Sequence, residues 1–344
     1  MKKLLMSVVI SSVVGLSLMS AQTPNGDLFE RADPAMDQLI APDAKLEVLA
    51  NHFGFLEGPV WIDEGPNSYL AVTDMAANVI YKWTPDGDVS VLLDRSGYTG
   101  YDIWRVGMPE PTGRGLYFMI GSNGLALDAQ GRLVIAGWAS RSIKRLEPDG
   151  SQTTLADRYD GKRFGGPNDL VVKKNGTIYF TDGVGGLRAR GDDPSRELMI
   201  QGVYMLKDGA VTLVDEVNGA NGIMLSPDER TLYASSGPGR TIMRYDVQPD
   251  DSATTNGRLF FDRSKDERTG IIDGMKVDSQ GNIWTSCCGG VHILTPDGKP
   301  LGMFRTPVSV TNLNWGGSDW KTLYITARTD LYRIRTLVAG IPGR

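Results

Sequence analysis

Histidine and cysteine are scarce in this 344-residue chain, which has two of each. The two histidines, His52 and His292, are far apart in sequence, and each lies in a stretch typical of an ordinary β-strand. A Ser-His-Asp triad needs a histidine beside its nucleophile, and the common zinc sites need several Cys or His ligands. The scarcity of both residue types therefore argues against serine-hydrolase chemistry and against a Cys- or His-ligated zinc.

The two cysteines, Cys287 and Cys288, are adjacent and so cannot join distant segments. Two interpretations stay open, a vicinal disulfide in an oxidising compartment or a pair of buried free thiols. The sequence also has no basic cluster and no glycine-rich phosphate loop, and its net charge is -5. Nucleic acid is therefore not expected as a partner.

Apolar runs are short except at the N-terminus. There, two lysines precede an apolar stretch of about fifteen residues that ends in small residues at Ala21, which is typical of a signal peptide rather than a membrane anchor. The sequence predicts a signal peptide at residues 1–21, a loose polar lead-in at 22–40, and a periplasmic or secreted protein. After cleavage of the signal peptide, no association with the membrane is expected.

Glycine is abundant, at 42 residues, and the chain contains an internal repeat. Each copy has a short alternating strand, a turn rich in Asp, Gly, Asn or Pro, and a second strand rich in β-formers. The six copies start at Glu57, Asn123, Asn168, Asn221, Asp273 and Thr311. Their spacing of about 40 to 65 residues is that of a four-stranded propeller blade.

Hairpins such as "VIYKWTPDGDVSVLL" and "SIKRLEPDGSQTTLA" supply the other two strands of a blade, because Asp-Gly suits a tight turn. The last repeat lacks its outer strand, and residues 44–53 are predicted to provide it and so close the ring. The prediction is an all-β, six-bladed β-propeller over residues 41–337, followed by a C-terminal tail at 338–344. A β-sandwich is the alternative, and the protein is expected to be a monomer by analogy with other propellers.

A polar residue begins the first strand of every repeat. We call these six the ring residues: Glu57, Asn123, Asn168, Asn221, Asp273 and Asn312. The first strand of each propeller blade lines the central channel, so their side chains should converge. A ring of carboxylate and amide oxygens suits a hard cation such as Ca²⁺, with Mg²⁺, Mn²⁺ and Zn²⁺ as alternatives. Any one of these residues could instead stabilise a turn, but six equivalent placements favour the metal.

Several stretches resemble the SMP-30/gluconolactonase family, which includes the regucalcins. They are "EGPVW", "GSNGLALDAQGRLV", "GGPNDLVVKKNGTIYFTD", "NGIMLSPDERTLYAS" and "DGMKVDSQGNIW". The resemblance extends over nearly the whole chain after residue 21 and implies a six-bladed propeller with one catalytic divalent metal on its axis. The resemblance implies that the metal ligands are Glu57, Asn168, Asn221 and Asp273. Asn123 matches a position near the metal or the substrate, and Asn312 is the least certain match.

The resemblance also implies hydrolysis of lactones, in which the metal polarises the carbonyl group and water attacks. Asp273 is the candidate catalytic residue, as ligand and base, with activation of water by the metal as the alternative. Asp169 is a weaker candidate that could instead stabilise its turn or orient Asn168. The other candidates for substrate binding are Trp138 and Arg141, in a loop after a second strand, and Arg105, in the insertion at residues 96–121. That insertion could be a lid or a loop packed on itself.

The expected function is thus an exported, metal-dependent lactonase with a small-molecule substrate such as a sugar lactone or a related cyclic ester. An esterase, a phosphoesterase or a sugar lyase on the same site is an alternative. So is a non-catalytic propeller that holds calcium structurally and binds a ligand. Family members often carry a histidine where "AGWASRSI" stands and an aromatic, proline-rich loop where "DGVGGLRAR" stands, so the substrate-facing mouth departs from the family pattern.

Overall fold

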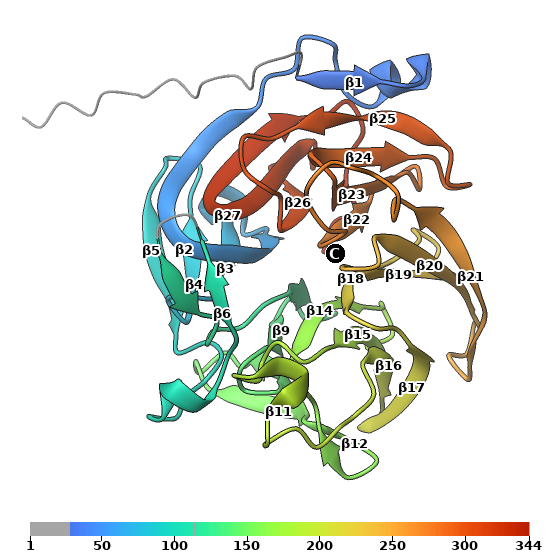
Figure 1. Cartoon of the computed structure of the whole chain (residues 1–344). Helices are drawn as coiled ribbons and strands as arrows, with labels where there is room; N and C mark the ends of the chain where they lie inside the picture. The colour runs from blue at the N-terminus through green and yellow to red at the C-terminus, as the bar shows by residue number, and fades with distance from the viewer. Residues whose placement is uncertain (1–27, 113–114, 344) are drawn as a thin grey trace, which may run out of the picture.

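Antiparallel sheets surround a central axis in the computed structural model, and Figure 1 is viewed along that axis. The structure describes residues 28–112 and 115–343, so the predicted signal peptide lies outside the described residues. The fold is all-β and propeller-like. Within the described residues, the only helices are four short 3-10 turns, η1 (Pro34–Gln38), η2 (Gly65–Asn67), η3 (Ile103–Arg105) and η4 (Arg190–Asp192). None of them has the length or apolar character needed to cross a bilayer.

Three sheets are simple four-stranded units, each formed by one repeat. Their first strands lie nearest the axis, and their last strands lie on the outside (Figure 1). They consist of β8 (Leu125–Leu127), β9 (Leu133–Gly137), β10 (Ser142–Leu146) and β11 (Gln152–Ala156); of β14 (Pro167–Val172), β15 (Ile178–Asp182), β16 (Gly202–Lys207) and β17 (Ala210–Glu216); and of β18 (Ala220–Leu225), β19 (Thr231–Ser236), β20 (Thr241–Val247) and β21 (Thr254–Asp262).

A fourth sheet has an extra strand from the N-terminal segment. It contains β22 (Met275–Val277), β23 (Ile283–Cys287), β24 (Gly290–Leu294) and β25 (Pro300–Arg305), and β1 (Phe29–Arg31) pairs with β25 at its outer edge. Met36, Leu39 and Ile40 follow β1 and are buried in the core. The prediction of a loose lead-in is therefore wrong for residues 28–40. A three-residue strand and a single 3-10 turn are too short to leave a periodic pattern in the sequence.

The first and last repeats share one six-stranded sheet. It contains β26 (Asn312–Gly316), β27 (Thr322–Arg335), β2 (Glu47–Ile62), β3 (Tyr69–Asp74), β4 (Val79–Trp83) and β5 (Val89–Asp94). The first half of β2 pairs with β27 and its second half with β3, so residues 44–53 contribute to the last repeat as expected. The described residues form five sheets of four or more strands rather than six separate ones, because β2 and β27 run on between two repeats.

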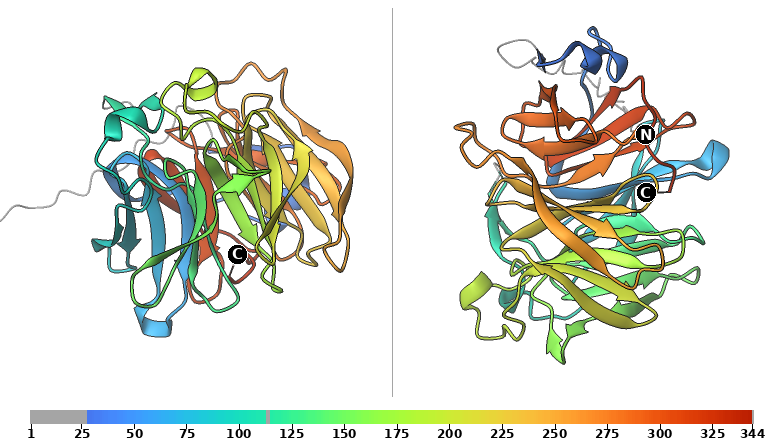
Figure 2. Two further views of the ribbon diagram at one scale, coloured as in Figure 1. Left: turned by 90° about the horizontal axis from the view of Figure 1, so that it is seen from below. Right: turned by 90° about the vertical axis from the view of Figure 1, so that its right-hand side faces the viewer.

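Apolar side chains between neighbouring sheets form the core. Trp284 of β23 and Trp315 of β26, for example, meet edge to face with ring centroids 5.3 Å apart. A small hairpin of β6 (Pro109–Pro111) and β7 (Leu116–Phe118) lies outside the main sheets, as does the pair β12 (Arg158–Tyr159) and β13 (Lys162–Arg163). Figure 2 shows that the hairpin and η4 lie at one end of the molecule and the C-terminus toward the other.

Candidate active site

Five ring residues meet in one cavity of about 700 Å³. They are Glu57, Asn123, Asn168, Asn221 and Asp273, and they come from β2, β14, β18 and the loops that precede β8 and β22. These elements surround the axis at the centre of Figure 1. The sixth ring residue, Asn312, is 2% exposed and donates a hydrogen bond from Nδ2 to Glu57 Oε2 over 3.1 Å. It therefore lies in the layer of side chains directly behind the cavity floor.

Irregular strand pairing positions the floor residues. On β2, Glu57 pairs with Thr73 and Val60 with Ala71, so three steps on one strand match two on its partner. Similar irregularities follow Pro167 on β14 and Ala220 on β18. Such bulges bend a strand and redirect its side chains, and they are common beside functional sites. The alternation of a regular strand is therefore interrupted at the residues that form the floor.

Two glycines allow the strands to approach one another at the floor. Gly58 follows Glu57 with a φ of +49°, and a Cβ there would lie 2.4 Å from the carbonyl oxygen of Asn123. A Cβ on Gly274, which follows Asp273, would lie 2.2 Å from the side chain of Asn312. Both contacts are too short for any larger residue. The "EG" and "DG" pairs in the sequence thus combine a polar side chain with a close contact to the next repeat.

Threonine hydroxyls fix the backbone of two ring residues, a feature that the sequence analysis missed. Thr73 Oγ1 donates to the carbonyl oxygen of Asn123 over 2.9 Å, and Thr181 Oγ1 donates to that of Asn221. Both threonines are fully buried and lie in second strands, in the similar stretches "AVTD" and "YFTD". The recurrence of Thr-Asp at the end of these strands was the available signal.

The floor carboxylates lie close together in surroundings that disfavour negative charge. Burial, and secondarily the charge of Asp169, raises the pKa of Glu57 to about 7. Burial and the neighbouring Glu57 likewise raise the pKa of Asp273 well above its ordinary value. Hydrogen bonds to Glu57 come from Gly58 N and Asn312 Nδ2, and both reach Oε2. Within the described part of the chain, no hydrogen bond occupies Oε1.

Two amide oxygens at the floor are also without partners. Oδ1 of Asn123 and Oδ1 of Asn221 are buried and accept no hydrogen bond from the described residues. An unpaired buried oxygen is costly, and so is a pair of adjacent carboxylates. A hard divalent cation would satisfy both groups, and Ca²⁺ commonly takes six to eight oxygen ligands. The donor set of Glu57, Asn168, Asn221 and Asp273 therefore fits such an ion.

This donor set differs from sites made only of charged or sulfur ligands. Over residues 28–112 and 115–343, no three His, Cys, Asp or Glu side chains are grouped so that they could hold a metal ion. The cavity floor has only two carboxylates, and the other oxygens belong to asparagine amides. A site with this composition depends on neutral oxygen ligands, which hard cations accept.

The predicted substrate-binding residues lie in different places. Asn123 is at the floor and Trp138 is in the wall of the cavity. Asp169 is 1% exposed and lies beneath the floor, where Leu170 N donates to Oδ1 over 2.9 Å and Asn312 Nδ2 to Oδ2 over 3.3 Å. Because both of its oxygens accept hydrogen bonds from below the floor, Asp169 can support the site but does not open into the cavity.

Arg105 and Arg141 do not line the cavity. Arg141 has a φ of +58°, which turns its side chain into the adjoining loops, where it donates to the carbonyl oxygens of Phe164 and Ser195. Arg105 lies on the outer side of the insertion, with an 84% exposed side chain paired with Asp102. The expectation that these two arginines face the substrate is therefore corrected. The arginines that do line the cavity are Arg190 and Arg328.

The insertion at residues 96–121 forms one wall of the cavity. Gly107 N and Met108 N donate to the carbonyl oxygens of Gly186 and Gly185 over 2.8 and 3.0 Å, so the insertion is hydrogen-bonded to the loop after β15. Trp138 packs so tightly under this loop that a Cβ on Gly185 would lie 1.9 Å from its ring. Met108, Glu110 and Met119 from the insertion line the cavity.

An acidic residue of the insertion joins two arginines at the mouth. Glu110 Oε1 accepts from Arg328 Nη2 over 2.9 Å, and Glu110 Oε2 lies 3.7 Å from Arg190 Nη2. Arg328 comes from β27 and Arg190 from η4. Three segments that are far apart in sequence are therefore joined by charge at the entrance, which the sequence analysis did not anticipate.

The rare residues have minor places in this geometry. Cys287 and Cys288 are both buried free thiols, and Cys287 lines the cavity. His292 lies on β24, where its Nε2 is 3.3 Å from the carbonyl oxygen of Cys288, and burial lowers its pKa to about 4. A histidine that stays neutral behind the cavity is a packing residue, which agrees with its interpretation as an ordinary strand residue.

Comparison with known proteins gives relatives for most of the chain. A gluconolactonase from Zymomonas mobilis is 33% identical over 319 residues, which is 89% of this chain and 85% of the relative. The solved structure of a gluconolactonase from Xanthomonas campestris has 30% identity and a TM-score of 0.75, and covers 91% of this chain and 96% of that one.

A more distant structure shows only that the fold is shared. It is the calcium-binding protein regucalcin from Agrobacterium tumefaciens, with 18% identity and a TM-score of 0.65 over 87% of this chain and 96% of that one. The sequence model of the SMP-30/gluconolactonase/LRE-like region matches residues 55–329, which include all six ring residues. The chain therefore belongs to the SMP-30/gluconolactonase/LRE-like family.

Proposed function

We propose that this protein is a metal-dependent lactonase that opens a sugar lactone or a related cyclic ester. The observation that carries the proposal is the meeting of two carboxylates and two unpartnered amide oxygens at the floor of one open cavity. Gluconolactonases among the similar proteins support the reaction class. The donor set supports a hard cation, and among such ions we propose Ca²⁺ before Mg²⁺, Mn²⁺ and Zn²⁺.

The residues of the floor have separate roles in this proposal. Glu57, Asn168, Asn221 and Asp273 would hold the cation. When bound, a divalent cation polarises the lactone carbonyl and offsets the charge that develops on its oxygen. Glu57 is only 2% exposed and therefore serves to bind. Asp273 is partly exposed to the cavity, so one of its carboxylate oxygens can take a proton from the attacking water.

The walls orient the substrate over this floor. Met75, Met119 and Trp138 form a buried apolar cluster that also lines the cavity, so one wall is suited to the ring carbons of a substrate. Arg190 and Arg328 lie on the cavity lining with Glu110 between them and provide hydrogen-bond donors for substrate oxygens. A pocket that combines an apolar wall with a few polar groups is typical of small-molecule sites.

Three further properties belong to the proposal. We assign six blades by dividing the six-stranded sheet where β2 and β27 change register, between Asn51 and Leu56. We assign export to the periplasm or beyond from the apolar N-terminal stretch that ends at Ala21. We expect a monomer that needs no protein partner for its reaction.

The test is a pH-stat assay on a panel of sugar lactones, aliphatic lactones, aryl esters and phosphotriesters. It compares metal-loaded protein, chelated protein, chelated protein with Ca²⁺ restored, and Asp273→Asn. We expect acid release from a sugar lactone that is lost on chelation, returns with Ca²⁺ and is absent from the variant. Asp246→Asn, which removes a surface carboxylate, is the matched control and should match the wild type.

Two results would reject this proposal. One is full hydrolysis by protein that elemental analysis shows to be free of metal. The other is metal-loaded protein that hydrolyses nothing in the panel, which would favour a lyase or a binding protein. A lyase is distinguished by product formation without incorporation of labelled oxygen from water.

A further inference from the structure

One ring strand carries a lysine where the others carry apolar residues. Counting each ring residue as the first position, the fourth positions are Val60, Ala126, Val171, Met224, Lys276 and Trp315. Lys276 lies on β22, three residues after Asp273. A lysine is seldom placed in such surroundings unless its charge is paired. Its position therefore calls for an explanation in terms of nearby negative charge.

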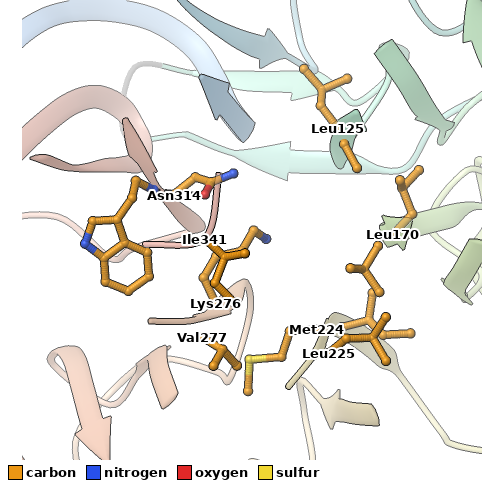
Figure 3. Close-up of a pocket in the computed structure, with 12 residues that line it drawn as sticks. Leu125, Leu170, Met224, Leu225, Lys276, Val277, Asn314 and Ile341 are labelled. Atoms are coloured by element: carbon orange, nitrogen blue, oxygen red, sulfur yellow. Dashed lines mark hydrogen bonds between the residues drawn. The ribbon is translucent and has the colours of Figure 1, made fainter. Parts of the chain in front are cut away.

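Lys276 reaches the underside of the candidate metal site. Its Nζ is 3.7 Å from Asp169 Oδ2 and 3.4 Å from Asn312 Oδ1. The lysine side chain is 13% exposed and that of Asp169 is 1% exposed. Figure 3 shows Lys276 beside Ile341, with Leu125, Leu170 and Met224 across the small space that all of them line. The ammonium group is thus held between an apolar layer and the polar floor.

The contacts of Lys276 determine how the Asn312 amide is oriented. A lysine can only donate, so it requires the carbonyl oxygen of this amide, which also accepts from Leu313 N over 2.9 Å. The NH₂ group of Asn312 is then directed at Glu57 Oε2, over 3.1 Å, and at Asp169 Oδ2, over 3.3 Å. Because Glu57 Oε2 is engaged in this way, Oε1 is left for the cavity.

The charged groups at the floor and directly beneath it have a net charge of two negative units. Glu57 and Asp273 lie at the floor and Asp169 directly beneath it, and their three carboxylates bring three negative charges when a cation is bound. Lys276 brings one positive charge to this layer. Arg190 and Arg328 share Glu110 at the mouth and are not counted here, because the sum covers only the floor and the layer directly beneath it. The remainder is two negative charges, which one divalent cation neutralises.

We propose that Lys276 is a positioning residue that sets the valence of the metal site. Its ammonium group neutralises Asp169 and, through Asn312, holds Glu57 with Oε1 toward the cavity. The site then has the charge for one divalent ion. This inference rests on the metal site of the proposed function and adds to it a residue that touches neither metal nor substrate. Its consequence is a preference between divalent and trivalent cations.

The experiment measures the ratio of the affinities for Tb³⁺ and Ca²⁺ by calorimetry, with terbium luminescence as a second readout. The two ions have similar size and ligand preference, so a loosened or displaced ligand changes both affinities together, whereas a change of one unit of charge changes their ratio. Lys276→Met adds one net negative charge and should raise the ratio about tenfold or more. Asp169→Asn removes one and should lower the ratio by a similar factor.

The double variant, Lys276→Met with Asp169→Asn, restores the net charge and should return the ratio to within about threefold of the wild type. It also leaves no unpaired buried charge, so it keeps the test valid if Lys276→Met does not fold. The matched control is Lys173→Met, which separates a buried lysine from Asp251 away from the ring residues and should leave the ratio unchanged.

Equal ratios in all variants would overturn the inference, because Lys276 would then be only a structural residue. A fall of both affinities without a change of ratio would have the same meaning. If wild-type protein binds neither ion, the proposed metal site fails and the inference with it. If it binds Ca²⁺ and hydrolyses a lactone but the ratios do not move, only the inference fails.

Discussion

The two ends of the inner strands differ in chemistry although they are only a few residues apart. At the end that faces the cavity of about 700 Å³, Glu57, Asn168, Asn221 and Asp273 lie on or just before the inner strands. We call this end, floor and entrance together, the mouth end. At the other end, the inner strands β8, β14 and β18 carry Leu125, Leu170, Met224 and Leu225 around a space of about 20 Å³, next to Ile341 of the C-terminal tail (Figure 3). One set of strands thus provides both an open polar site and a filled apolar layer.

The two ends of the channel therefore have different roles, stability at the apolar end and the candidate active site at the mouth end. The apolar end gains stability from burial and leaves almost no space. The mouth gives up stability, because it gathers carboxylates and amide oxygens that lack partners within the protein. A rigid apolar layer directly behind the floor keeps the oxygens in place without contacting the substrate. Changes at the mouth should therefore alter activity, and changes at the other end should alter stability.

The largest expected effect is the loss of activity in Glu57→Gln. This variant removes a charged ligand but keeps the shape of the side chain, so kcat/KM at fixed Ca²⁺ should fall about a hundredfold or more. The free energy of unfolding of the chelated protein should not fall, because a buried carboxylate is removed. Lactone hydrolysis and urea unfolding measure the two quantities. If kcat/KM and the free energy of unfolding both fell, the mouth end would contribute to stability as well as to activity.

The converse change is Leu225→Ala at the apolar end. Leu225 is 2% exposed and belongs to a core cluster between two sheets. Truncation should lower the free energy of unfolding by about 3 kcal/mol, since the filled channel cannot collapse around the lost atoms. The value of kcat/KM at 25 °C should stay within about twofold of the wild type. A tenfold loss of kcat/KM in folded variant protein would show that the apolar layer tunes the floor directly.

The pH dependence of stability should come from the mouth end. Asp182, at the end of β15, accepts hydrogen bonds from Gly165 N and Gly166 N, and burial raises its pKa from 3.8 to about 7. As the pH rises from about 4 to 7, the unfolded chain ionises this group before the folded protein does, so stability is lost across that range. Between pH 5 and 7 the loss from Asp182 should be about 2 kcal/mol.

Asp182→Asn isolates this contribution. Urea unfolding of chelated protein at pH 5, 6 and 7 should show a smaller decline in the variant than in the wild type. Chelation keeps metal binding from adding its own pH dependence. Identical pH profiles would mean that Asp182 is ionised in the folded protein at pH 5, stabilised by its two backbone donors.

The sheets were predictable from sequence because their signals are local. Alternation, turn residues and the recurrence of six segments depend only on neighbouring residues, and they placed Asn168, Asn221 and Asp273 correctly at the axial end of their strands. The packed segment at residues 28–40 and the continuity of β2 with two repeats depend on partners more than 200 residues away. No local pattern carries that information.

The site was predictable in its floor but not in its walls. The floor residues recur once in each repeat, so equivalence between repeats revealed them. Arg141 and Arg328 could not be distinguished by sequence, because the direction of a long side chain after a turn depends on which loop covers it. The contact of Lys276 with Asp169 is likewise tertiary, although its place among apolar fourth positions was a visible exception.

The smallest effect is expected at the outermost part of the mouth, in Glu110→Gln. Glu110 is partly exposed and lies between the positive charges of Arg190 and Arg328. Loss of its charge should therefore lower the free energy of unfolding by less than about 1 kcal/mol. KM for a neutral sugar lactone should rise about two- to fivefold as the wall loosens, with kcat nearly unchanged. KM for a lactone that carries a carboxylate should fall instead, because two guanidinium groups lose their counter-ion.

The matched control is Glu47→Gln, which breaks an exposed ion pair with Arg333 on the outer part of the sheet and should change neither KM value. If KM changes equally for neutral and charged lactones, Glu110 only stabilises the cavity wall. The floor alone would then determine which substrate is chosen.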